Sequence, residues 1–148
     1  LATFIPPTED AISEQTAYTM LGMLQNVVRA GTAGRLRWAY NVTGEVGGKT
    51  GTSNENRDAW FVGVTPNLVA GAWCGGEDQS VHISGAGEGG AALALPIFGR
   101  FITKDYADPR LGVKPTDTFS RPNNVVTYDC DEENREQAQT ETEDEFFD

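Results

Sequence analysis

One strand-like segment of this 148-residue chain gathers residue types that can bind an anion. The segment Gly47–Ser53 reads Gly-Gly-Lys-Thr-Gly-Thr-Ser, so a cation, several hydroxyls and a residue without a side chain lie close together. Alternate residues of a strand point to opposite faces, which places Lys49 and Gly51 on one face and Thr50 and Thr52 on the other. Lys-Thr-Gly alone is a short motif, and its plainer interpretation is a solvated strand end beside a turn.

Three strands and two helices are predicted to position this segment. Short turns separate the strands, which is typical of neighbouring antiparallel strands. The second and third strands carry apolar residues on both of their faces, so we expect helices to cover both faces of the sheet. The expected strands are Val46–Ser53, Ala59–Thr65 and Leu68–Cys74, and the expected helices are Glu14–Ala30 and Gly90–Thr103. The sequence therefore predicts an α/β (α+β) protein with an antiparallel sheet flanked by helices.

Local signals set the helix limits. Ser13 can cap the first helix, and Gly31 can end it. Its apolar positions, expected to face the core, are Ala17, Met20, Leu21, Leu24, Val27 and Val28. Residues 35–40 between the first helix and the first strand form a short helical or extended piece. The glycines from Gly85 to Gly90 are interpreted as a linker, because no phosphate-binding Gly-Lys-Ser or Gly-Lys-Thr follows them.

Charge is concentrated at one end of the chain. Residues 129–148 hold ten acidic side chains and Arg135, which gives −9 of the net charge of −11. The chain has three lysines and eight arginines, and these are scattered, so we expect no nucleic-acid binding. No apolar run is long enough to span a membrane and no signal peptide is recognisable. Residues 107–148 are expected to be a proline-containing linker followed by a disordered acidic tail.

The remaining polar and aromatic residues have structural interpretations. His82 lacks a nearby acidic or cysteine partner in the sequence, so a loop position is favoured over a metal or triad role. Cys74 and Cys130 make a poor disulfide framework and are interpreted as unpaired thiols. No metal or cofactor is expected. Ser53, Asn54 and Arg57 are assigned to a turn, Asp58 to capping that turn, and Trp60 and Trp73 to the core.

The residues around the lysine carry a family resemblance. Two residues after Gly-Gly-Lys-Thr-Gly-Thr-Ser, the chain contains Asn-Arg-Asp-Ala-Trp-Phe-Val-Gly-Val-Thr-Pro, and soon after it Val-Ala-Gly-Ala-Trp-Cys-Gly. This stretch resembles the class A penicillin-binding proteins. The Val-Arg-Ala-Gly-Thr-Ala turn and the Gly-Gly-Ala-Ala-Leu-Ala-Leu-Pro-Ile-Phe segment resemble that family in the same order. The resemblance covers residues 5–106. It implies that residues 1–106 are the C-terminal portion of a transpeptidase domain with a partial penicillin-binding-protein or serine β-lactamase-like fold.

The resemblance also implies roles for individual residues. Lys49 would attract the terminal carboxylate of a D-Ala-D-Ala peptide stem or of a β-lactam, and the hydroxyls of Thr50 and Thr52 would hold it. Gly51 would let the substrate lie along the strand edge, and the backbone N–H of Thr52 would donate to the oxyanion. The plainer alternatives are a soluble edge lysine, a bulge glycine and ordinary strand threonines. The implied partners are peptidoglycan stem peptides and β-lactams at the outer, periplasmic side of the bacterial cytoplasmic membrane.

The nucleophile of that family is not encoded in this sequence. It lies in Ser-x-x-Lys, whereas the residues three positions before the lysines here are Val46, Phe101 and Leu111. The middle motif Ser-x-Asn is also absent. We therefore expect a missing upstream half of the domain to provide both motifs and an N-terminal anchor to provide the membrane attachment. The fragment alone would be inactive, with an open sheet edge and an uncovered apolar face. The alternatives are a D-Ala-D-Ala carboxypeptidase or β-lactamase relative, a noncatalytic module that binds wall peptides or a partner, and a strand platform with no ligand.

Overall fold

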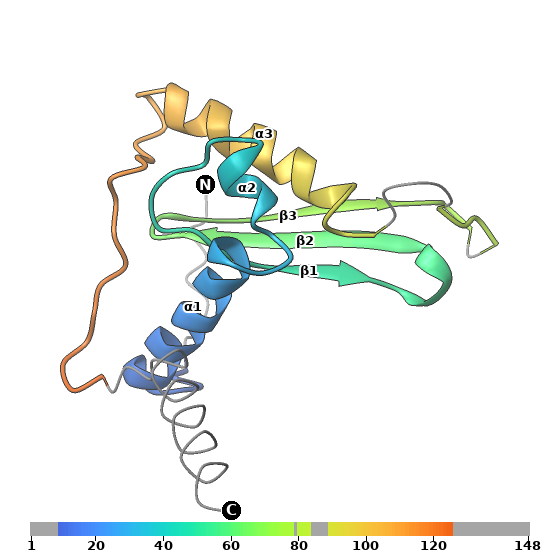
Figure 1. The fold of residues 1–148 in the computed structure, drawn as a ribbon. Coiled ribbons are helices and arrows are strands. Elements are labelled where there is room, and N and C mark those ends of the chain that lie inside the picture. Colours follow the sequence, from blue (N-terminus) through green and yellow to red (C-terminus); the bar gives the residue numbers. More distant parts are fainter. Residues whose placement is uncertain (1–8, 79, 84–88, 126–148) are drawn as a thin grey trace, which may run out of the picture.

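The computed structural model describes residues 9–78, 80–83 and 89–125 and shows one antiparallel sheet with helices packed on it (Figure 1). The predicted α+β class is therefore confirmed. The elements are α1 (Glu14–Arg29), α2 (Arg35–Trp38), β1 (Gly47–Thr52), the 3-10 helix η1 (Asn54–Asn56), β2 (Asp58–Thr65), β3 (Leu68–Gly75) and α3 (Ala94–Ala107).

The three strands follow each other in the sheet in the order β1-β2-β3. Both pairs are antiparallel, as predicted, and Phe61 of the central strand lies opposite Thr50 on one side and Ala72 on the other. Because directly opposite residues share a face, Thr50, Phe61 and Ala72 point to the same side of the sheet. We call this the inner face and the opposite side the outer face.

Helix α1 begins and ends where the sequence predicts. The Ser13 hydroxyl accepts a hydrogen bond from the backbone N–H of Thr16 at 3.2 Å, which satisfies one of the first free donors of the helix. At the other end a Cβ on Gly31 would lie 2.9 Å from the Cα of Val27, so a residue without a side chain fits there. Met20, predicted on the core-facing side, is exposed because it lies at the margin of the apolar stripe.

Helix α3 begins later than predicted, at Ala94 instead of Gly90. Residues 89–93 form a turn, in which the backbone N–H groups of Ala92 and Leu93 both donate to the carbonyl of Gly89. This start puts Pro96 at the third position of the helix, where the N–H that proline lacks would have no helical partner. The helix extends past the expected end at Thr103 to Ala107, since Ile102 and Asp105 are still buried against the core.

The core lies between the inner face and the helices. Helix α3 packs on β2 and β3, and α1 packs on β1 (Figure 1). The rings of Phe61 and Phe98 lie 5.0 Å apart between centroids, tilted by 58°. The fully buried large side chains around them are Leu36, Leu95, Ile102, Val28, Val42 and Val46.

The outer face is open, which corrects two expectations. Trp60 and Trp73, predicted in the core, are 46% and 45% exposed, and Val62 and Val69 of the same face are 46% and 68% exposed. Among the described residues the helices pack mainly on the inner face, although Leu24 of α1 lies beside Gly47 at the outer face of β1. Apolar residues on both faces of a strand indicate that both faces are buried in the complete fold, but they do not show which segment covers each face.

An extended segment, residues 108–125, returns from the end of α3 to the beginning of α1 (Figure 1). Asn67 of the β2–β3 turn donates to the Asp117 carboxylate at 2.7 Å. The backbone N–H of Phe119 donates to the Glu45 carboxylate at 2.6 Å, just before β1. Segment 108–125 is thus tied to one end of the sheet, where β1 begins and where the β2–β3 turn lies. The acidic tail and Cys130 lie outside the described residues.

The close packing of Gly63 against Phe98 gives a stability prediction. A Cβ on Gly63 would lie 2.3 Å from the Phe98 ring, which cannot move away because it is buried against Phe61. Gly63→Ala should therefore lower the free energy of unfolding by about 1–3 kcal/mol, the usual cost of overpacking, in urea denaturation. Gly71→Ala is the matched control, since its Cβ would meet nothing closer than 3.9 Å on the open outer face. Equal stability of the two variants would contradict the packing.

Candidate functional site

The candidate site is the free edge of β1. Strand β1 pairs with β2 on one side and has no strand on the other among the residues the structure describes. The backbone N–H of Ser53 donates to the carbonyl of Asp58, so the backbone of Ser53 points toward β2. Because such pairs alternate along an antiparallel ladder, Gly51 also points its backbone groups toward β2, whereas those of Thr50 and Thr52 point to the free edge. An extended peptide can therefore add to this edge.

Lys49 lies at this edge with an exposed side chain. Its Nζ donates to the carbonyl oxygen of Thr50 at 2.8 Å, which holds the ammonium group beside the edge. Lys49 lies opposite Val62 in the register, on the outer face. The ammonium group thus provides a positive charge next to the unpaired backbone groups of the strand.

The two threonine side chains lie on the inner face, and another element contacts each of them. The Thr50 hydroxyl lies 3.0 Å from the hydroxyl of Thr32, which belongs to the turn after α1. The Thr52 hydroxyl accepts a hydrogen bond from the backbone N–H of Gly90 at 3.0 Å. As predicted, Lys49 lies on one face of the strand and Thr50 and Thr52 lie on the other. Each threonine hydroxyl has a hydrogen-bond partner, Thr32 for Thr50 and Gly90 for Thr52.

Thr32 and Gly90 were not assigned to the site from the sequence. Gly90 was interpreted as part of a linker, yet it packs on the motif strand, and a Cβ on it would lie 2.3 Å from the carbonyl oxygen of Trp60. Only the Gly-Thr-Ala and Gly-Gly segments noted in the resemblance pointed toward them. Their sequence separations from Thr50 and Thr52 are 18 and 38 residues, which no local pattern spans.

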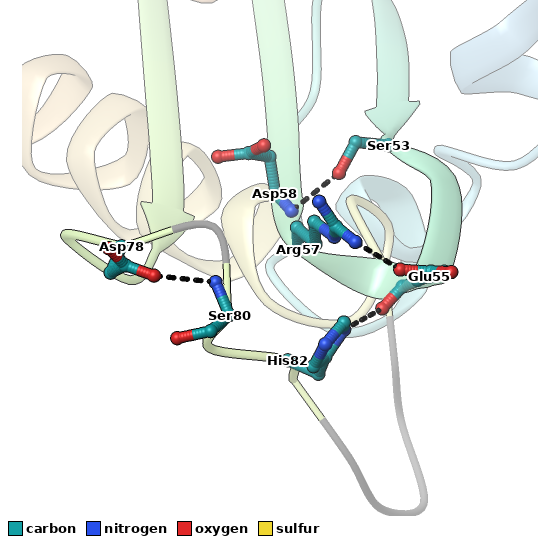
Figure 2. A network of polar contacts seen from close by, with 7 residues as sticks. All are labelled: Ser53, Glu55, Arg57, Asp58, Asp78, Ser80 and His82. Carbon is teal, nitrogen blue, oxygen red and sulfur yellow. Dashed lines mark hydrogen bonds and ion pairs between the residues drawn. The ribbon is translucent and has the colours of Figure 1, made fainter.

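A polar network surrounds the turn from β1 to β2 (Figure 2). The Ser53 hydroxyl accepts from the backbone N–H of Asp58 at 2.7 Å, which confirms Ser53 as a turn residue. Glu55 forms an ion pair with Arg57 across the turn. The loop after β3 contacts the same turn, since His82 Nδ1 lies 3.1 Å from the carbonyl oxygen of Glu55. The turn at the end of β1 is therefore held by contacts within the turn and by a contact from the loop after β3.

Two carboxyl groups near this turn have lowered pKa values. The hydrogen bond and the charge of the Arg57 guanidinium hold the pKa of Glu55 below its ordinary value of 4.5. The backbone N–H and then the hydroxyl of Ser80 lower the pKa of Asp78. Glu55 adopts a positive φ of 60°, a conformation that is unfavourable for a residue of its kind. These interactions stabilise the ionised carboxylates and hold the turn in place.

The other candidate residues lie away from the edge of β1 or in structural contacts. His82 occupies a loop position, as predicted, and Cys74 is a half-buried free thiol. Asp58 accepts a hydrogen bond from Trp73 Nε1 at 2.9 Å on the outer face. Within the described ranges no group of three or more potential metal ligands occurs. None of the helices seen in those ranges is both long and apolar enough to cross a membrane.

Comparison with known proteins identifies the family. No family model matches the chain. Over 130 residues the chain is 38% identical to penicillin-binding protein 1A of Pseudomonas aeruginosa, which covers 87% of this chain and 15% of that protein. It is 40% identical over 118 residues to penicillin-binding protein 1A of Neisseria flavescens, covering 79% of this chain and 14% of the relative. The chain is homologous to a part of penicillin-binding protein 1A.

A solved structure supports the same family. The crystal structure of penicillin-binding protein 1A from Haemophilus influenzae matches with a TM-score of 0.67 and 29% sequence identity, over 78% of this chain and 17% of that one. The fold predicted from the resemblance, part of a penicillin-binding transpeptidase fold, is confirmed. The chain spans only about 15% of the length of these penicillin-binding proteins.

The contact between Gly90 and β1 gives a prediction on stability. In Gly90→Ala the new methyl group would overlap the backbone at Trp60 and Gly51, so the loop must move and the hydrogen bond to Thr52 is lost. We expect the free energy of unfolding to fall by about 1–3 kcal/mol, measured by urea denaturation. Gly22→Ala in α1 is the control, because nothing lies within 4 Å of its Cβ and alanine favours a helix. A neutral Gly90→Ala would show that the loop does not pack on β1.

The ion pair of Glu55 predicts a pH dependence. A carboxyl whose pKa is lower in the folded state stabilises the fold at pH values above its unfolded pKa, and this contribution is lost as the pH falls through the folded pKa. We expect the NMR-monitored titration of the Glu55 carboxyl to shift upward toward 4.5 in Arg57→Ala. Arg100→Ala, an exposed arginine on α3, should leave it unchanged. An unshifted titration in Arg57→Ala would refute the assigned cause.

Proposed function

We propose that this chain supplies the substrate-binding strand of a serine-type DD-transpeptidase that cross-links D-Ala-D-Ala peptide stems of peptidoglycan. The observation that carries the proposal is the edge of β1, which pairs with no strand among the described residues: the exposed Lys49 side chain is bonded to the Thr50 carbonyl at this edge, and the hydroxyls of Thr50 and Thr52 lie on the inner face of the same strand. The names of the relatives add that proteins of this family bind penicillin. A peptide stem and a β-lactam both present a carboxylate beside a reactive carbonyl, so one edge can serve both.

Each residue of the motif has a role in this proposal. Lys49 attracts the terminal carboxylate of the stem or of the β-lactam, and the hydroxyls of Thr50 and Thr52 hold it by hydrogen bonds. Gly51 has no side chain, so the bound peptide lies close along the strand. The backbone N–H of Thr52 faces the free edge and donates to the oxyanion, an interaction for which comparable donors lower the barrier by about 3 kcal/mol.

The nucleophile comes from a segment outside this sequence. Acyl transfer through an acyl-serine needs a serine activated by a base, and no Ser-x-x-Lys occurs here. The exposed outer face fits this proposal, because Trp60, Val62 and Trp73 leave an apolar surface for an upstream half of the domain to cover. The assembled enzyme would lie at the outer face of the bacterial cytoplasmic membrane, attached through an N-terminal anchor encoded upstream.

A labelling experiment with fluorescent penicillin tests the proposal. This chain would be compared with a version extended upstream through the nearest Ser-x-x-Lys, with Lys49→Ala introduced into the extended form. We expect only the extended form to be labelled, and Lys49→Ala to reduce the labelling rate at least about 10-fold, since a hydrogen bond to a charged group is lost. Lys104→Ala removes an exposed lysine of α3 and should not change the rate.

The same experiment decides against the rival functions. If the extended form is folded and is not labelled, the enzyme is excluded and a noncatalytic module that binds wall peptides through Lys49 becomes the better explanation. Product analysis with a stem peptide and with a β-lactam separates the other rivals, because a carboxypeptidase transfers the acyl group of the stem to water, a β-lactamase rapidly hydrolyses the β-lactam, and a transpeptidase transfers the acyl group of the stem to an amine.

A further inference from the structure

Thr32 contacts the proposed substrate site from a different element. It lies in the turn that follows α1, and its hydroxyl is 3.0 Å from that of Thr50. The neighbouring residues fix this turn, because Ala33 is fully buried and its backbone N–H donates to the carbonyl of Val27 at 3.0 Å. The side chain of Thr32 itself is exposed. A rigid turn therefore presents an accessible hydroxyl beside the motif strand.

The hydroxyl pair of Thr32 and Thr50 always has one proton left to donate. Each hydroxyl carries one O–H donor and two acceptor lone pairs. If Thr32 donates to Thr50, the proton of Thr50 is available to a ligand, and if the direction is reversed, that of Thr32 is available. Thr52 is in a similar position, since its oxygen accepts from the Gly90 N–H and its own O–H is not used in that bond. The arrangement suits a ligand that only accepts hydrogen bonds.

We propose that Thr32 is a further substrate-positioning residue, which orients the Thr50 hydroxyl, or itself donates, toward the carboxylate of the bound stem peptide or β-lactam. This inference rests on the proposed transpeptidase function. A carboxylate is an acceptor at both oxygens, so it can use the proton that the pair leaves free together with that of Thr52. The competing explanation is that the contact only ties the turn after α1 to β1, in which case the ligand's carboxylate is irrelevant.

Acylation of the full-length protein tests the proposal. The second-order rate constant of acylation by benzylpenicillin and by its methyl ester would be measured by mass spectrometry for the wild type, Thr32→Val and Thr32→Ser. We expect Thr32→Val to slow acylation by benzylpenicillin about 10-fold, the effect of weakening one hydrogen bond to a charged group. It should not slow acylation by the ester, which lacks the ionised carboxylate. Thr32→Ser retains the hydroxyl and should restore the rate with benzylpenicillin.

Two further variants complete the experiment. Thr43→Val is the matched control, an exposed threonine in the loop before β1 that should leave both rates unchanged. Thr32→Val combined with Thr50→Val should slow benzylpenicillin by less than the product of the single effects, because the two hydroxyls act as a pair.

The outcomes separate this inference from the proposed function. Equal slowing of both ligands by Thr32→Val, or no slowing of either, overturns the role of Thr32 and leaves the transpeptidase intact. Failure of the folded wild-type protein to be acylated overturns the proposed function and this inference with it.

Discussion

Among the residues that the structure describes, β1 pairs with a strand on one side only, and the proposed site depends on this constraint. Hydrogen-bonded and non-hydrogen-bonded pairs alternate along the β1–β2 ladder. The backbone groups of Gly51 therefore point toward β2, whereas those of Thr50 and Thr52 point toward the free edge. Because successive side chains of a strand point to opposite faces, Lys49 lies on the face opposite the two threonines. If another strand of the fold covered this edge, the motif would have no backbone groups for a ligand. The edge is therefore the substrate-accessible part of the proposed site.

Close packing behind the sheet keeps this edge in place. Glycines on the inner side let other elements approach the strands: Gly63 admits the ring of Phe98, and Gly90 packs directly over the backbone of Gly51. Residues without side chains thus bring α3 and its preceding loop against β1 and β2. The outer face shows the opposite situation, with Trp60 and Trp73 in solvent. One face is packed by the described helices, and most of the other face is exposed in the part of the chain that the structure describes.

Much of the fold could be predicted because local signals agree with it. Ser13 caps α1, the turn residues around Ser53 and Pro66 separate the strands, and the strand limits differ from expectation by one residue at most ends. The errors have tertiary causes. Trp60 and Trp73 have the apolar character of core residues, yet burial depends on a second surface, and within the described residues their side chains remain about half exposed. The start of α3 moved because Gly90 packs on β1 and does not join the helix.

The sequence by itself determined most limits of the elements, the antiparallel pairing of the three strands and the placement of Lys49 on the face opposite Thr50 and Thr52, because these follow from residue type and short spacing. It also carried the resemblance that the relatives confirm. Only the tertiary structure decided which face of the sheet is buried by helices and which residues distant in the sequence contact each other. Thr32 contacts Thr50 and Gly90 contacts Thr52 because folding brings a helix end and a distant loop onto one strand, and such contacts leave no periodic trace in the sequence.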